Sequence, residues 1–225
     1  SEMCIRDSAK GLPPRVKNST EFFIDENGKV TGEALVDCYS SSVNYSLKIM
    51  LIRRTLLERF LHESRTSGKD DFESILPRNI SLLNVHAYEQ KGFVRVLESL
   101  RSYYDISLEL LKSENRKALF TPDRPVFTKV RDQIPAIYGI GADVSNSLIA
   151  DGCRIDGTVE NSILFRGVTV AKGAVVRNSI VMQSSYIGEG AKVESVITDK
   201  SVVVKSGRTL CGAPTFPVYI GKGIV

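Results

Sequence analysis

The stretch VENSILFRGVTVAKGAVVRNSIVM, Val159 to Met182, contains nearly the same heptad twice. Val-Glu-Asn-Ser-Ile-Leu-Phe returns 17 residues later as Val-Arg-Asn-Ser-Ile-Val-Met. Two related heptads flank this pair, VSNSLIA from Val144 and VESVITD from Val193, so that successive heptads are 15, 17 and 17 residues apart. A self-similar period of about 20 residues is typical of solenoid proteins, in which each repeat forms one coil.

A shorter period of six lies inside the longer one. An aliphatic residue is followed four places later by a small residue and six places later by another aliphatic one, as in Val170-Ala-Lys-Gly-Ala-Val-Val176. Aliphatic residues can stack inside a coil, and small residues fit its tight corners. The pattern predicts a left-handed parallel β-helix of hexapeptide repeats over residues 136–225. An antiparallel β-sandwich is the alternative.

The repeat lacks the residues that give other β-helices their chemistry. Acyltransferases and carbonic-anhydrase-like proteins with such repeats use histidine as a base or a metal ligand, because imidazole has a pKa near 7 and a neutral lone pair. The two histidines of this chain, His62 and His86, lie outside the repeat. We therefore expect no catalytic residue and no metal site in the β-helix, and we assign it to assembly or regulation.

The first half of the chain is predicted to be mixed α/β. Asn27-Gly28 suits the tight turn of a hairpin, and Leu56 to Leu61 form one face of a helix. Phe93 to Leu97 is a strand candidate, and an amphipathic helix follows from Leu100 to Leu111. These elements define a domain over residues 9–112.

The domain boundaries follow from composition. Residues 113–135 are interrupted by prolines and rich in charges, so they are predicted to be a connector. Residues 1–8, SEMCIRDS, fit no neighbouring pattern, and we interpret them as a non-native leader on an amino-terminally truncated chain.

Composition excludes several classes of function. With 42% hydrophobic and 25% charged residues, the chain is typical of a globular protein, and no apolar run reaches the roughly 18 residues that span a bilayer. The net charge of +4 comes from well-mixed residues without a basic stripe, so nucleic-acid binding is not predicted. Four cysteines without a CxxC pair favour free thiols in the cytoplasm.

Two stretches carry a resemblance to a known family. These are Phe93 to Tyr104, FVRVLESLRSYY, and Ser145 to Val168, SNSLIADGCRIDGTVENSILFRGV. From about residue 9 onward the chain resembles the sugar-nucleotide pyrophosphorylases, above all bacterial glucose-1-phosphate adenylyltransferase (ADP-glucose pyrophosphorylase), and within it a divergent subunit that pairs with a catalytic homologue. The resemblance implies the carboxy-terminal part of a nucleotidyltransferase, Rossmann-like α/β domain followed by a left-handed β-helix.

The family transfers an adenylyl group from ATP to glucose 1-phosphate, with a divalent metal, Mg²⁺, held by two carboxylates. The family's motif around the second carboxylate, Tyr-Trp-Arg-Asp-Val-Gly-Thr, corresponds to Phe93–Ser99. Val96 takes the place of the aspartate and cannot ligate a hard cation. Glu98 takes the place of the glycine and could supply a replacement carboxylate if the segment were a straight strand.

Two further substrate motifs of the family are also altered. The sugar-contacting Ser-Met-Gly-Ile-Tyr appears as Ser46-Leu-Lys48-Ile-Met50, with Lys48 in place of the glycine, and a third motif is shortened to Asp71–Pro77. The resemblance therefore implies no catalytic residue, no bound cofactor or metal, and a degenerate set of substrate-binding positions. These are Ser46, Lys48, Asp71, Val96 and Glu98.

The β-helix, by contrast, keeps the family's features. In the family a basic residue after an aspartate helps to bind a phosphorylated effector, and Lys200 takes that position, although an ordinary solvated lysine at a turn is the alternative. The resemblance implies a cytoplasmic regulatory subunit that joins a catalytic ADP-glucose pyrophosphorylase subunit in a hetero-oligomer, a tetramer. Two alternatives remain: an active enzyme that uses Glu98, and a related assembly protein of mannose-1-phosphate guanylyltransferase-like or translation-factor-like architecture.

Overall fold

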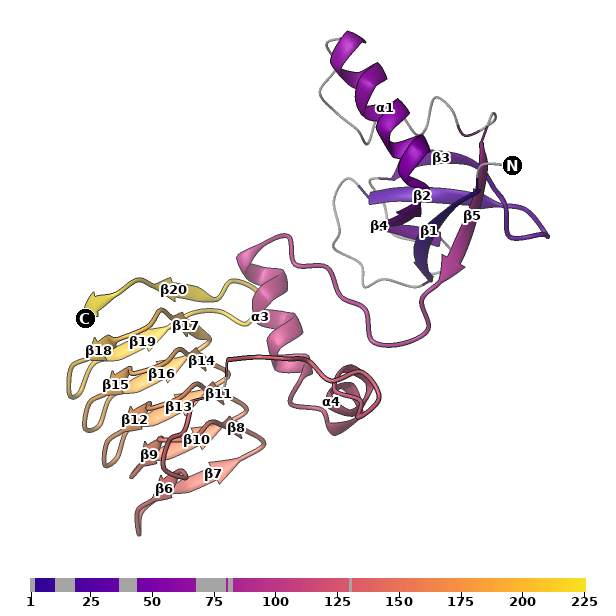
Figure 1. Ribbon diagram of the computed structural model, residues 1–225. Coiled ribbons are helices and arrows are strands. Elements are labelled where there is room, and N and C mark those ends of the chain that lie inside the picture. Colours follow the sequence, from indigo (N-terminus) through magenta and orange to yellow (C-terminus); the bar gives the residue numbers. More distant parts are fainter. Residues whose placement is uncertain (1–2, 11–18, 37–43, 68–79, 81–82, 130) are drawn as a thin grey trace. The chain divides into compact units, whose positions relative to one another are not determined.

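The computed structural model of the chain describes residues 3–10, 19–36, 44–67, 80, 83–129 and 131–225 (Figure 1). The chain divides into two compact units, Ser1–Val96 and Leu97–Val225. The shortened third motif, Asp71–Pro77, lies outside the described residues.

The first unit is a five-stranded mixed sheet with one described helix, α1 (Arg54–Ser67). The strand order is β3-β2-β4-β1-β5. β1 runs parallel to β5 and antiparallel to β4, while β2 and β3 form an antiparallel hairpin. The strands are β1 (Met3–Lys10), β2 (Ser19–Ile24), β3 (Val30–Val36), β4 (Asn44–Ile52) and β5 (Asn84–Glu89).

The predicted hairpin turn is confirmed between β2 and β3. Gly28 has φ +79°, which glycine adopts without steric cost. The Asp25 carboxylate accepts the backbone N–H groups of Asn27 and Lys29 at 2.9 and 2.8 Å. The strands on either side bring Phe22 and Val30 into one buried core, shared with a face of α1.

The segment interpreted as a leader takes part in this sheet. β1 lies between β4 and β5, in register with β5 from Met3 opposite Asn84 to Ser8 opposite Glu89. The facing edges of β4 and β5 carry backbone groups that need hydrogen-bond partners, and β1 supplies them. Residues 3–8 therefore form part of the sheet, whereas the sequence pattern led us to interpret them as a leader.

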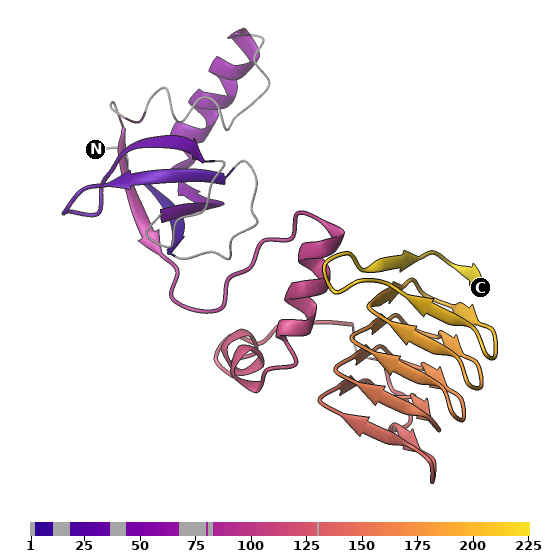
Figure 2. The same ribbon diagram turned by 180° about the vertical axis from the view of Figure 1, so that it is seen from behind.

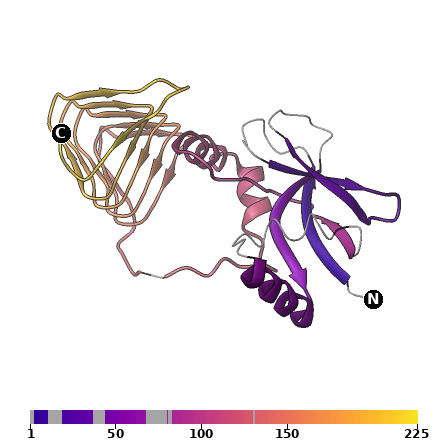
Figure 3. The ribbon, with the colours of Figure 1, turned by 90° about the horizontal axis from the view of Figure 1, so that it is seen from above.

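The second unit begins with α3 (Leu100–Glu109) and α4 (Ser113–Leu119) and continues as a parallel β-helix with three faces, which Figures 1 and 3 show as stacked coils. Sheet 1 contains β7 (Asp143–Ser145), β10 (Thr158–Glu160), β13 (Val175–Arg177), β16 (Lys192–Glu194) and β19 (Thr209–Cys211). Sheet 2 contains β8 (Leu148–Ile149), β11 (Ile163–Leu164), β14 (Ile180–Val181), β17 (Val196–Thr198) and β20 (Val218–Ile220). Sheet 3 contains β6 (Ile137–Tyr138), β9 (Arg154–Ile155), β12 (Thr169–Val170), β15 (Tyr186–Ile187), β18 (Val202–Val204) and β21 (Gly223–Ile224).

The repeated heptads stack in register, which confirms the predicted parallel coils and excludes the sandwich. The first residues of the four heptads pair in order along sheet 1, and all point into the coil interior: Val144, Val159, Val176 and Val193. Each fully buried aliphatic side chain contributes about 1.5–3 kcal/mol relative to exposure. Cys153 lies in the same core, and burial raises the pKa of its thiol.

The asparagine of the first three heptads turns the chain from sheet 1 to sheet 2, and Ser195, with φ 52°, takes this place in the fourth. Asn146, Asn161 and Asn178 have φ of 41°, 48° and 45°, the left-handed region that asparagine tolerates better than most residues. Their side chains form a ladder along the axis: Asn146 Nδ2 donates to Asn161 Oδ1 at 2.9 Å, and Asn161 Nδ2 donates to Asn178 Oδ1 at 2.6 Å. We call this edge the Asn–Ser corner.

The serine that follows each asparagine satisfies the backbone of the next coil. The hydroxyl of Ser147 accepts the N–H of Ser162, Ser162 accepts that of Ser179, and Ser179 accepts that of Val196, each at 3.1 Å. Each of these corners after the first therefore depends on the serine of the coil before it. This is why the Asn-Ser dipeptide recurs in the sequence.

Substitution of Asn161 separates the two roles of this residue. Asn161→Gly keeps the left-handed backbone but removes two amide hydrogen bonds, so we expect a loss of about 1 kcal/mol in the free energy of unfolding. Asn161→Ala adds the cost of a Cβ in the left-handed region, about another 1 kcal/mol. Urea unfolding measures both. Equal stability of the two variants would contradict the backbone argument, and wild-type stability of both would contradict the ladder.

Helix α3 packs on the outer face of sheet 2, as Figure 2 shows from behind. Ser99 and Ser102 form a reciprocal capping box at its start. Tyr104 lies buried against Ile180 and Ile197, and its hydroxyl donates to the carbonyl of Asn178. Burial raises the pKa of Tyr104, which keeps the hydroxyl protonated as a donor.

The boundary between the compact units therefore falls at Val96–Leu97, earlier than the predicted connector at residues 113–135. The amphipathic pattern of α3 was assigned to the α/β domain, but its apolar face covers sheet 2. Part of the predicted connector is also helical, because α4 occupies Ser113–Leu119. Arg116 of α4 donates to the carbonyls of Leu110 and Leu111, which satisfies the end of α3.

Candidate functional site

The turns between sheet 2 and sheet 3 place polar side chains in a row along the β-helix. The N–H of Ser184 donates to the carbonyl of Arg166, and the N–H of Ser201 donates to the carbonyl of Gln183, both at 2.9 Å. This spacing stacks Arg166, Gln183 and Lys200 at equivalent positions of consecutive coils. Adjacent members of the row are separated by one strand spacing, about 4.8 Å.

A strand-free segment ahead of the β-helix completes the site. The N–H of Gly152 donates to the carbonyl of Ile134 at 2.7 Å, which fixes the segment against the first turn of this row. Gly152 leaves room for the Gln133 side chain, because a Cβ there would lie 2.7 Å from its Oε1 atom. The result is a cavity of about 270 Å³, which we call the basic corner. Its lining is Lys129, Arg131, Gln133, Arg166, Gln183, Ser184 and Lys200.

The basic corner is strongly cationic. Four of its seven lining residues are Lys or Arg, and none is Asp or Glu. Within the described part of the chain, these four side chains form no ion pair with a carboxylate. Like charges held this close are unfavourable until an anion joins them, and guanidinium groups match phosphate oxygens with paired hydrogen bonds.

Asp199 lies beside the corner but does not line it. Its Oδ1 atom accepts the N–H of Lys200 at 2.7 Å, and this hydrogen bond, helped by the Tyr219 hydroxyl, lowers the pKa of the Asp199 carboxyl. The carboxylate is thus engaged by its own turn. The positive charge of Lys200 also contributes to this lowering, while its side chain lines the basic corner.

Lys200 is the one predicted effector residue, and the structure places it with three cations that the sequence reasoning did not select. Lys129 and Arg131 belong to residues 113–135, which were interpreted from the sequence only as a charged connector. Arg166 had a detectable signal, because it follows its heptad at the position that Lys200 takes after the last one.

Among the substrate-binding positions, Ser46 and Lys48 lie together on β4. The N–H of Lys48 donates to the Ser46 hydroxyl at 3.1 Å. Lys48 has φ +58°, so the lysine that replaces the family's glycine keeps a backbone conformation that favours glycine. This agreement supports the alignment of the two motifs. Asp71 lies outside the described residues.

The predicted strand at Phe93–Leu97 is absent, because these residues have no regular secondary structure. Val96 is the last residue of the first compact unit, whereas Glu98 belongs to the second. The N–H of Glu98 donates to the Ser102 hydroxyl at 3.0 Å, so Glu98 is part of the approach to α3. Val96 and Glu98 therefore do not belong to one strand, and the capping box of α3 follows at Ser99.

These residues do not fit the family's Mg²⁺. Val96 offers no oxygen ligand where the family has aspartate. In the described part of the chain, no three His, Cys, Asp or Glu side chains cluster closely enough to hold a metal ion. Among the described helices, none combines the length and apolar character of a membrane span.

Comparisons with known proteins agree with this architecture. Residues 137–213 match the family model "GlmU-like, C-terminal hexapeptide". The chain is 42% identical over 180 residues to glycogen biosynthesis protein GlgD of Bacillus subtilis, covering 80% of this chain and 52% of the relative. It is 39% identical over 138 residues to GlgD of Geobacillus stearothermophilus, covering 51% and 40%. It is 29% identical over 143 residues to glucose-1-phosphate adenylyltransferase of Clostridium perfringens, covering 62% and 36%.

A mixed α/β unit followed by in-register coils defines a two-unit protein with a hexapeptide-repeat β-helix. The chain belongs to the ADP-glucose pyrophosphorylase family, as a homologue of the GlgD glycogen biosynthesis proteins. It spans about half the length, or less, of the curated relatives named above.

Proposed function

We propose that the chain belongs to a regulatory, non-catalytic subunit of glucose-1-phosphate adenylyltransferase, acting in the cytoplasm in glycogen biosynthesis. The observation that carries this proposal is a contrast between the two units. The positions that correspond to the family's metal carboxylate and sugar-contacting glycine hold Val96 and Lys48, whereas the β-helix keeps uninterrupted coils. Two relatives, 42% and 39% identical to this chain over the matched residues, are named for glycogen biosynthesis.

In this proposal the catalytic partner, not this chain, binds Mg²⁺ and converts ATP and glucose 1-phosphate to ADP-glucose and pyrophosphate. The two subunits form a hetero-oligomer, a tetramer. The basic corner binds a phosphorylated sugar that alters the partner's activity. Its four cations and 270 Å³ cavity suit a ligand with one or two phosphate groups.

Coexpression tests the partnership. The chain is produced with the glucose-1-phosphate adenylyltransferase encoded in the same genome, and the mixture is analysed by sedimentation velocity. We expect a complex larger than either protein alone. Separate sedimentation of the two proteins at micromolar concentration would argue against a regulatory subunit and leave the anion site to be tested by itself.

A further inference from the structure

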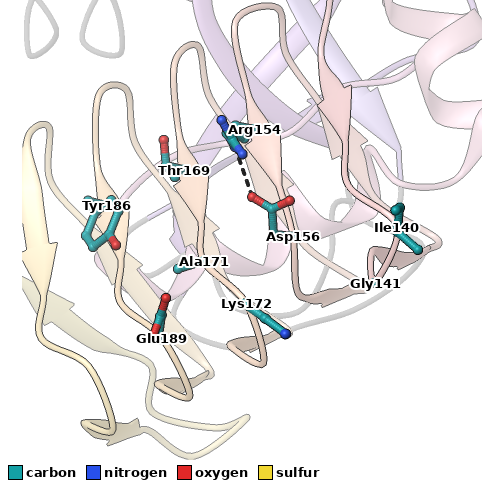
Figure 4. A pocket seen from close by; sticks show the side chains of 9 residues that line it. All are labelled: Ile140, Gly141, Arg154, Asp156, Thr169, Ala171, Lys172, Tyr186 and Glu189. Carbon is teal, nitrogen blue, oxygen red and sulfur yellow. Dashed lines mark hydrogen bonds and ion pairs between the residues drawn. The ribbon is translucent and has the colours of Figure 1, made fainter.

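A second cavity, of about 540 Å³, lies along sheet 3 and the turns that lead from sheet 3 to sheet 1. The basic corner lies at the other edge of sheet 3, at the turns that lead from sheet 2. Figure 4 shows it as an open groove with Tyr186 and Ile140 at its two ends and Asp156 between them. The Tyr186 side chain is 41% exposed and the Ile140 side chain is fully exposed. The volume falls within the range of about 300–1,000 Å³ typical of small-molecule sites.

The groove exists because one coil is two residues shorter than its neighbours. Val170 and Val175 enclose a four-residue turn, whereas Ile155 and Thr158 enclose only Asp156 and Gly157. The shorter turn lies flat against the next coil, since a Cβ on Gly157 would lie 2.4 Å from the carbonyl oxygen of Ala174. The 15-residue spacing between the first two heptads therefore leaves a notch in this edge.

The lining of the notch is polar but balanced in charge. Arg154 and Lys172 provide two positive charges, and Asp156 and Glu189 provide two negative charges. Arg154 Nε lies 2.9 Å from Asp156 Oδ2, so the pair is held in place while other atoms of both groups face the groove. Thr169 and Tyr186 add hydroxyl groups. A phosphorylated ligand has no electrostatic advantage here, in contrast to the basic corner.

We propose that this groove binds a neutral saccharide of a few sugar units. Carboxylates accept hydrogen bonds from sugar hydroxyls, and guanidinium and ammonium groups donate to them. The Tyr186 ring and the Ile140 side chain give apolar surfaces for the C–H faces of the sugar rings. The balanced charge leaves no net field that would favour a charged ligand. This inference rests on the groove alone and does not depend on the proposed regulatory function.

Titration of the full chain with maltotriose, cellotriose and glucose 1-phosphate tests the inference by NMR and calorimetry. We expect saturable binding of at least one trisaccharide with a Kd on the order of millimolar. The two trisaccharides distinguish an α-linked from a β-linked source. We expect Tyr186→Ala to weaken this binding about tenfold or more, because it removes the main apolar surface.

Two control variants separate the groove from the rest of the molecule. Phe165→Ala removes an aromatic side chain of similar exposure, 39%, that does not line the groove, and it should leave saccharide binding unchanged. A charge-reversed basic corner, Arg166→Glu with Lys200→Glu, should also bind the trisaccharide as the wild type does. The proposal is overturned if neither trisaccharide binds, if Tyr186→Ala binds normally, or if glucose 1-phosphate occupies the groove in preference.

Discussion

Gly157→Ala should lower the free energy of unfolding of the β-helix by about 3 kcal/mol, which is near the upper end of the range for overpacking a core. A Cβ at this position would lie 2.4 Å from the carbonyl oxygen of Ala174 and 2.7 Å from that of Ala171. Both are backbone atoms of the next coil, and they cannot rotate away as a side chain would. The N–H of Thr158 also donates to the carbonyl of Ala174 at 2.8 Å, so relief of the clash would weaken this hydrogen bond.

Gly221→Ala is the matched control. It adds the same methyl group to the same β-helix, but no heavy atom lies within 4 Å of the added Cβ. Denaturant unfolding followed by far-UV circular dichroism should show a loss for Gly157→Ala and almost none for Gly221→Ala. Similar midpoints for the two variants would show that the short coil is not packed as closely as the structure has it.

Charge reversal at the basic corner should abolish most of its affinity for phosphorylated ligands. Each charge-assisted hydrogen bond is worth about 1.5–3 kcal/mol, so the loss of two, together with the added repulsion, predicts a decrease of about 100-fold or more. The variant is Arg166→Glu with Lys200→Glu. Calorimetric titration with glucose 1-phosphate and with pyrophosphate measures the change. Binding to the wild type should also weaken as salt rises.

Lys192→Glu with Arg208→Glu is the matched control, because it changes the net charge equally at two exposed positions that do not line the basic corner. This control should lose little affinity. An equal loss in both double variants would show that the overall charge of the chain, rather than the corner, attracts the anion.

Much of the β-helix could be predicted from the sequence, because each coil repeats the chemistry that the neighbouring coil requires. The Asn-Ser dipeptides mark a corner where left-handed backbone and ladder hydrogen bonds recur, and a recurring local constraint appears as a recurring sequence. The helix from Leu100 was also predictable from its apolar period. Its packing partner was not, because an apolar face does not identify the surface that it covers.

The candidate site was less predictable for a physical reason. Arg131 and Lys200 lie 69 residues apart in the chain and meet only because the coils stack in register and Gly152 fixes the preceding segment. Lys200 and Arg166 could be marked from their places directly after a heptad, whereas Lys129 and Arg131 had no such pattern. The alternative in which Glu98 replaces the lost carboxylate was conditional on a straight strand, and Phe93–Leu97 have no regular secondary structure.

The rate of ADP-glucose formation distinguishes a regulatory partner from an enzyme. The chain and the glucose-1-phosphate adenylyltransferase of the same genome are assayed separately and together, with and without a sugar phosphate. We expect no turnover by the chain alone. We expect the mixture to have an altered rate or effector response, which the Arg166→Glu, Lys200→Glu variant loses while the complex persists. Turnover by the chain alone, or a partner whose kinetics are the same with and without the chain, would contradict it.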